Sequence, residues 1–138
     1  MEIIMKLLRW VLFWLSMIPI MILNALLREK VYGPLVNELT AHQLSTVTGC
    51  LFIGIYVWGI WPLLHIHSRP ASIRVGVIWL ILTIAFEFAF GKYIMHHSWY
   101  RLFNDYALWH GRVWALFLVW LIWLPYLIYR YRAEKRIK

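Results

Sequence analysis

The chain has 138 residues, of which 63% are hydrophobic, 18% aromatic and only 14% charged. Soluble domains average about 45–50% apolar and about 25% charged residues, and so short a chain could not bury this much apolar surface in water. The composition therefore excludes a soluble domain, and a single cysteine, Cys50, excludes internal disulfides. The formal net charge of +8 comes from Lys and Arg residues whose positions fit membrane topology better than a phosphate-binding surface, so no nucleic-acid partner is expected.

Four apolar segments, at residues 7–27, 44–64, 75–95 and 113–129, are each close to the roughly 20 residues that a helix needs to cross a bilayer. The sequence lacks the alternating strands of a membrane barrel, so these spans are expected to be helices. The connections are short, which makes successive helices antiparallel. We therefore expect one domain over residues 1–138, an all-α integral membrane protein built as a four-helix transmembrane bundle.

A shorter helix is expected at residues 98–110, between the third and fourth spans. Its apolar residues recur at helical spacing, which predicts an amphipathic helix at the membrane interface, and Ser98 is expected to cap its N-terminus. The apolar residues are Trp99, Leu102, Phe103, Tyr106 and Trp109.

The positive charges predict the orientation of the bundle. Nine of the fourteen Lys and Arg residues fall on the side that holds both termini, five of them within residues 130–138. The positive-inside rule then places both termini in the cytoplasm. The basic tail is expected to touch anionic lipids at the cytoplasmic face, with a specific macromolecular partner as the alternative.

Polar residues gather at the outer ends of the predicted helices, and Glu87 is the most informative of them. It lies about 12 Å inward from Met95 at about 1.5 Å per residue, a depth at which a carboxylate needs a partner inside the bundle. One interpretation makes Glu87 a proton carrier, a general base or a ligand. The other makes it half of a buried ion pair, with Arg28 or Arg112, that stabilises the bundle.

Other candidates surround Glu87 in this prediction. Asn24 and Arg28 are four residues apart, which places both on one face of the first helix, directed at Glu87. Arg101 and Asp105 have the spacing of a surface ion pair, and the alternative is that Asp105 and Arg112 close over Glu87 as a polar lid. The catalytic candidates are Glu87 and Asp105. The ligand-binding candidates are Asn24, Arg28, His42, Arg101 and Arg112, with an ordinary interfacial histidine as the alternative for His42.

A metal or cofactor site has little support in the sequence. The metal candidates are His96 and His97, but adjacent histidines on a helix point about 100° apart, and no recognised ligand spacing is present. No two histidines face each other at mid-membrane depth, as a haem would need, and no cofactor is indicated. Most tryptophans are expected at membrane interfaces or facing lipid. These are Trp10, Trp14, Trp58, Trp61, Trp99, Trp109, Trp120 and Trp123.

The run from Phe86 to Gly91, with Gly111-Arg112-x-Trp114 after it, resembles small bacterial membrane proteins. No family and no activity are carried over from this resemblance, and the expected location is a bacterial cytoplasmic membrane. Three classes of function remain open. The first is a protein that binds a small or lipid-derived ligand at the outer polar site, with proton-coupled transport of that ligand through Glu87 as an extension of the same class. The others are a membrane enzyme that uses Glu87 or Asp105 as acid or base, and an accessory subunit, within a homodimer or larger complex, whose buried charges specify packing.

Overall fold

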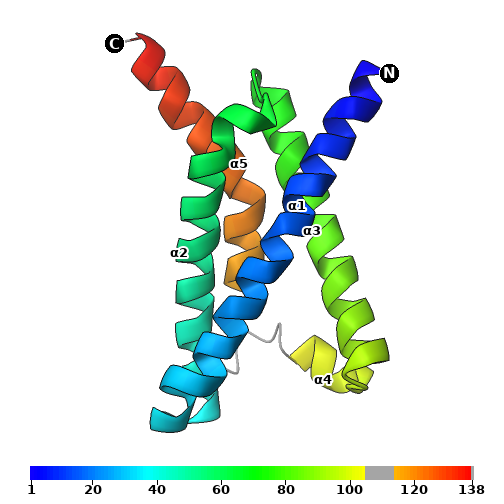
Figure 1. Cartoon of the computed structure of the whole chain (residues 1–138), viewed down its shortest axis with the longest axis vertical. Coiled ribbons are helices and arrows are strands. Elements are labelled where there is room, and N and C mark those ends of the chain that lie inside the picture. Colours follow the sequence, from blue (N-terminus) through cyan, green and yellow to red (C-terminus); the bar gives the residue numbers. More distant parts are fainter. Residues whose placement is uncertain (105–113, 138) are drawn as a thin grey trace.

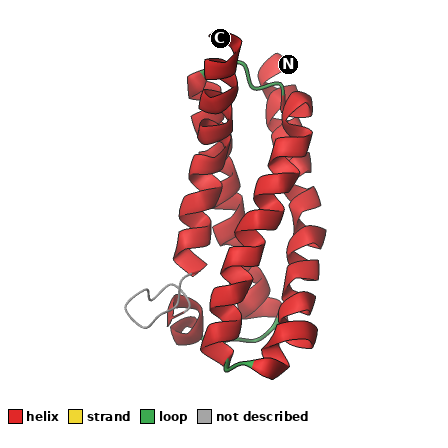
Figure 2. Ribbon diagram, turned by 90° about the vertical axis from the view of Figure 1, so that its left-hand side faces the viewer, coloured by secondary structure: helices red, strands yellow, loops and turns green. Residues whose placement is uncertain are grey.

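The computed structural model describes residues 1–104 and 114–137, which form helices and their connections without any strand. The two termini lie at one end of the molecule, here called the terminal end (Figures 1 and 2). The connection between the first two helices lies at the opposite end, here called the distal end. The α-helices are α1 (Glu2–Leu27), α2 (Glu38–Leu64), α3 (Arg69–Ala89), α4 (Trp99–Asn104) and α5 (Trp114–Ile137).

The predicted fold class is confirmed. Within the described residues, four helices are long and apolar enough to cross a membrane, and the short helix α4 lies between the last two of them. Ser98 caps α4, because its Oγ accepts a hydrogen bond from the backbone N–H of Arg101 at 3.1 Å. The remainder of the predicted interfacial helix, residues 105–110, lies outside the described residues.

The helices extend beyond the apolar segments that predicted them. Asn37 caps α2 by accepting a hydrogen bond from Thr40 N at 2.8 Å, so the helix begins at Glu38 rather than near residue 44. Ser68 caps α3 in the same way, and Pro70 occupies its first turn, where no amide donor is needed. An apolar run marks only the part of a helix in hydrocarbon, whereas polar caps decide where the helix begins.

At the distal end, two helices change from α to π geometry. The π-helical segment after α1 is Arg28–Tyr32, and the one after α3 is Phe90–Ile94. Such segments are rare and are frequent at functional sites. In Figure 1, α3 diverges from α1 and α2 toward this end, so the π segments stand on opposite sides of the widening.

Indole rings fill the centre of the bundle toward the terminal end. Trp10 and Trp14, expected at the interface or facing lipid, are buried instead, and Trp79 is fully buried. Trp10 Nε1 donates to the carbonyl oxygen of Leu64 at 3.1 Å, and Trp79 Nε1 donates to that of Trp10 at 2.9 Å. Trp14 Nε1 donates to Thr83 Oγ1 at 2.9 Å. A buried indole needs an acceptor for its N–H, and two backbone carbonyls and one hydroxyl supply it here. We call Trp10, Trp14 and Trp79 the tryptophan layer.

Candidate functional site

A cavity of about 820 Å³ opens in the distal half of the bundle, and we call it the distal cavity. Five of the ligand-binding and catalytic candidates line it, contributed by α1, α2, α3, α4 and the π segment after α1. They are Asn24, Arg28, His42, Glu87 and Arg101. Asp105 and Arg112, the other two candidates, lie outside the described residues, as does the lid predicted from them.

Glu87 lies in the wall of the cavity and is half-buried. Its Oε1 accepts a hydrogen bond of 2.7 Å from Trp114 Nε1, near the start of α5. The ring of Trp114 in turn stacks on Phe117, with ring centroids 4.5 Å apart. The carboxylate is therefore positioned by a donor whose own orientation is set by packing. The 2.7 Å distance between Trp114 Nε1 and Glu87 Oε1 is typical of a hydrogen bond to a charged acceptor.

The partners expected for Glu87 were Arg28 and Arg112. Arg28 Nη2 instead lies 4.0 Å from Glu29 Oε1, on the π segment that both residues share. A pair between Glu87 and Arg112 falls outside the described residues. Sequence reasoning missed Trp114 as a partner, because the two residues are 27 positions apart on different helices and no spacing rule connects them.

Asn24 was expected to point toward Glu87, but its amide bonds to α2. Its Nδ2 donates to the backbone oxygen and to Oγ of Ser45, at 3.0 and 3.1 Å, and its Oδ1 accepts from Thr48 Oγ1. The residue is 1% exposed. Gly49 makes this approach feasible, since a Cβ there would lie 3.2 Å from Asn24 Nδ2. Asn24 therefore joins α1 to α2 at the cavity wall and has its hydrogen-bonding capacity used within the protein.

His42 and Arg101 stand at the distal rim of the cavity. His42 Nε2 lies 3.9 Å from Glu38 Oε1, one turn earlier in α2. Arg101 is exposed, and the ion pairs described within residues 1–104 and 114–137 do not include it. The short helix that carries Arg101 packs against the second π segment at Gly91, where a Cβ would lie 2.5 Å from Leu102 Cδ2. A side chain at position 91 would displace the end of the Leu102 side chain from this contact.

The two metal candidates, His96 and His97, lie in different environments. His97 lines the cavity, whereas His96 is exposed and takes a left-handed backbone conformation with φ of 57°. In the part of the chain that the structure describes, no group of three or more His, Cys, Asp or Glu side chains could hold a metal ion. The sequence predicts no role for His97 other than that of a metal ligand, and helical spacing cannot predict its place at the cavity because the chain leaves helical geometry at His96.

The wall of the cavity changes character with depth. Charged and imidazole groups come from the distal ends of the helices, and deeper positions contribute apolar side chains such as Met17, Phe117 and Leu121. Trp14 and Thr83, joined by their hydrogen bond, lie at its inner limit. Beyond them, the other two members of the tryptophan layer, Trp10 and Trp79, and the fully buried Val57 fill the bundle. The arrangement suits a molecule with a charged head and an apolar body.

Comparison with protein-family models, with curated proteins and with solved structures found no match.

Proposed function

We propose that the protein binds one amphiphilic molecule in the distal cavity, with its anionic head at the rim and its single hydrocarbon chain directed inward. The observation that carries the proposal is the graded wall of this cavity, charged at the rim and apolar below. Small-molecule sites typically combine a mostly apolar lining with a few polar groups that orient the ligand. A volume of about 820 Å³ falls within the range of about 300–1,000 Å³ that such sites have.

The charges at the rim support an anionic head. Arg28 lies 4.0 Å from the carboxylate of Glu29, and that carboxylate is largely exposed. Exposed pairs of this kind contribute little, typically less than about 1 kcal/mol, so a phosphate can take over the donors of Arg28 at small cost. Arg101 adds a second guanidinium, and a guanidinium can bind a phosphate through two parallel hydrogen bonds.

The closed inner end favours binding over passage through a single chain. A path toward the terminal end would have to separate the rings of the tryptophan layer and break the indole hydrogen bonds of Trp10 and Trp79. The side chains around that path are apolar and buried. We therefore propose that Glu87 accepts hydrogen bonds from the ligand head beside Trp114, rather than passing a proton across the membrane.

Native mass spectrometry of the detergent-solubilised protein with lysophosphatidylglycerol, which has one chain and a phosphate, tests this proposal. Arg28→Gln and Arg101→Gln should each weaken binding by roughly tenfold or more, since a hydrogen bond to a charged group contributes about 1.5–3 kcal/mol. Lys92→Gln is the matched control, because Lys92 lies at the same end but over the ring of Trp99, with Nζ 5.1 Å from its centroid.

Monoolein, which has one chain and no phosphate, should bind more weakly than lysophosphatidylglycerol to the unmodified protein. Equal binding of the two probes, or an equal loss in all three variants, would contradict an anionic site at the rim. Binding that none of the three variants changes would instead favour the accessory role, in which these charges only specify packing.

We also propose that the termini face the cytoplasm of a bacterial cell and that the distal cavity faces the opposite side of its cytoplasmic membrane. The excess of cations at the terminal end supports this orientation. Labelling of intact cells with a membrane-impermeant maleimide tests it, in a Cys50→Ser background with a new cysteine at Lys30 or at Lys135. The cysteine at position 30 should react and that at position 135 should not.

A further inference from the structure

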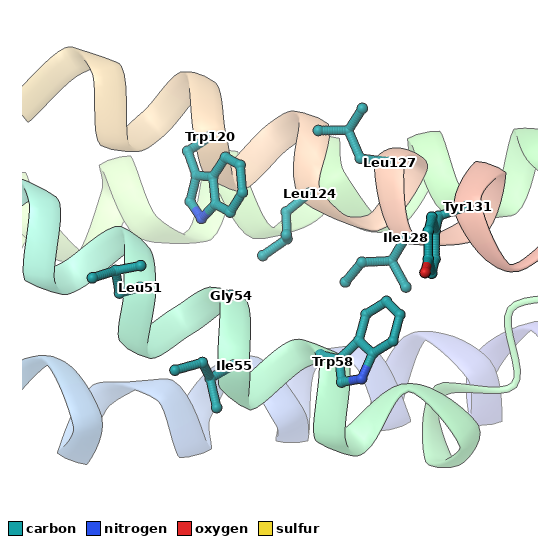
Figure 3. A pocket seen from close by; sticks show the side chains of 9 residues that line it. All are labelled: Leu51, Gly54, Ile55, Trp58, Trp120, Leu124, Leu127, Ile128 and Tyr131. Atoms are coloured by element: carbon teal, nitrogen blue, oxygen red, sulfur yellow. The ribbon is translucent and has the colours of Figure 1, made fainter.

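A second hollow lies on the outside of the bundle, between α2 and α5 (Figure 3). It is a groove of about 400 Å³ whose lining consists of leucine, isoleucine, tryptophan, tyrosine and one glycine, and we call it the α2/α5 groove. Trp120 forms part of its wall and is held there by a hydrogen bond of 3.0 Å from its Nε1 to the carbonyl oxygen of Cys50. Gly54 makes room for this ring, since a Cβ there would lie 3.2 Å from Trp120 Cζ2.

The length of the groove matches one leaflet of a bilayer. Its lining on α5 runs from Trp120 to Tyr131, which at about 1.5 Å per residue is roughly 16 Å. Half of a hydrocarbon core of about 30 Å is about 15 Å. Trp58 and Tyr131 stand at the terminal end of the groove, and aromatic residues of this kind mark the membrane interface. The groove therefore extends from the interface at the terminal end to about the middle of the membrane.

Two cations stand where the groove meets this interface. The guanidinium of Arg132 lies 4.3 Å from the centroid of the Trp58 ring, and Lys135 Nζ lies 4.7 Å from that of Tyr131. The nearby carboxylate of Glu134 is taken by Arg130, at 3.2 Å. The ion pairs described for residues 1–104 and 114–137 include neither Arg132 nor Lys135. The hydrogen bond described for the Arg132 guanidinium is from Nη2 to the Trp58 oxygen, which leaves donors for an incoming acceptor.

We infer that the α2/α5 groove binds an anionic phospholipid of the leaflet at the terminal end. One acyl chain lies in the groove, and the phosphate faces Arg132 and Lys135. Charge complementarity distinguishes this occupant from a second copy of the chain. Nine of the fourteen Lys and Arg residues fall on the side that holds both termini, so a second copy in parallel orientation would bring further positive charge to these two cations. A zwitterionic lipid fills the same groove but brings no net negative charge to them.

Native mass spectrometry of the full chain tests the inference, with phosphatidylglycerol and phosphatidylcholine that carry identical acyl chains. Phosphatidylglycerol should bind more tightly, and the double variant Arg132→Gln/Lys135→Gln should remove the difference. Each cation near an anionic surface contributes about fivefold in affinity, so the double variant should lose about 25-fold. The matched control Lys6→Gln/Arg9→Gln removes the same charge from the terminal end of α1 and should keep the preference.

A second pair of variants tests whether the groove itself holds the lipid. Ile55 lines the groove and is 70% exposed, so Ile55→Trp fills the groove without disturbing the core. Ile81 is 60% exposed on α3, outside the groove, and Ile81→Trp is its control. The lipid-bound fraction should fall in Ile55→Trp and remain unchanged in Ile81→Trp.

Three outcomes would overturn the inference. The first is equal binding of the two phospholipids to the unmodified protein. The second is an equal loss of phosphatidylglycerol binding in both charge variants, which would mean that only the overall charge of the terminal end matters. The third is a dimer in the mass spectrum that Ile55→Trp dissociates, which would identify a second copy as the occupant. Because Arg28 lies at the distal end, whereas Arg132 and Lys135 lie at the terminal end, Arg28→Gln should leave the preference for phosphatidylglycerol unchanged if the inference is correct.

Discussion

The hydrogen bond between Trp114 and Glu87 connects α5 to α3 at the wall of the distal cavity, and its strength can be measured by a double-mutant cycle. Trp114→Phe removes the N–H donor and keeps an aromatic ring next to Phe117, whose centroid lies 4.5 Å away. Glu87→Gln removes the negative charge and keeps a carbonyl acceptor. The cycle therefore isolates what the charge of Glu87 adds to a bond 2.7 Å long.

The expected coupling energy follows from the nature of the acceptor. A hydrogen bond to a charged group contributes about 1.5–3 kcal/mol and a neutral one about 0.5–1.5 kcal/mol, a difference of about 1 kcal/mol. Hydrogen bonds between transmembrane helices average about 0.6 kcal/mol and reach about 1.7 kcal/mol in such cycles, so this value lies within the observed range. We expect a coupling energy of about 1 kcal/mol between the two substitutions, since Glu87 is half-buried and its partner is well positioned.

The assay is unfolding by SDS in mixed micelles, followed by far-UV circular dichroism, for the unmodified protein, both single variants and the double variant. Glu87→Gln combined with Trp123→Phe is the control cycle, because Trp123 is 53% exposed and packs edge-to-face against Tyr126. Distant pairs add within about 0.3–0.5 kcal/mol, which sets the resolution of the experiment. A coupling energy below that limit for Trp114 and Glu87 would refute the view that a charged carboxylate is held by the indole.

Two further predictions concern helix packing, and the same unfolding assay measures both. Gly76→Ala should lower the free energy of unfolding by about 1–3 kcal/mol, because its Cβ would lie 2.1 Å from the carbonyl oxygen of Ile122 on α5. Gly59→Ala meets no atom within 4 Å and should raise that free energy by up to about 1 kcal/mol, so the opposite order of the two variants would contradict the close contact. Asn24→Ala should lower it by about 2 kcal/mol, because Ser45 and Thr48 lose a buried partner, and an unchanged stability would show that the bonds between α1 and α2 contribute nothing.

Much of the distal site could be anticipated from the positions of charged residues along the helices. In an antiparallel bundle, residues at the outer ends of different spans lie at the same level of the membrane, so Arg28, His42 and Glu87 were expected to be near one another. All three line the distal cavity. The roles predicted for these side chains remain predictions. Which of them bond to one another was not predictable, because Arg28 and His42 are near carboxylates of their own helical segments and Glu87 bonds to an indole from another helix.

The tryptophans show the limit of reasoning from composition. A tryptophan is equally compatible with the interface, with lipid and with a core that offers an acceptor to its N–H. Only the packing of α1 against α2 and α3 places carbonyl and hydroxyl groups beside Trp10 and Trp14. Trp58 is exposed beside Arg132, and its place at the membrane interface stays a prediction.

The amino-acid sequence by itself determined that this protein is helical and membrane-embedded, because hydrocarbon admits only backbones that satisfy their own hydrogen bonds and helices of about 20 apolar residues do so. It also determined that most of its Asp, Glu and His residues, unlike most of its Lys and Arg residues, fall on the side away from the termini. Tertiary structure alone decided that the bundle is open distally and closed by the tryptophan layer, and that α2 and α5 leave a groove between them. These features depend on how closely helices approach, and single contacts set that distance, such as Gly76 against the backbone of Ile122.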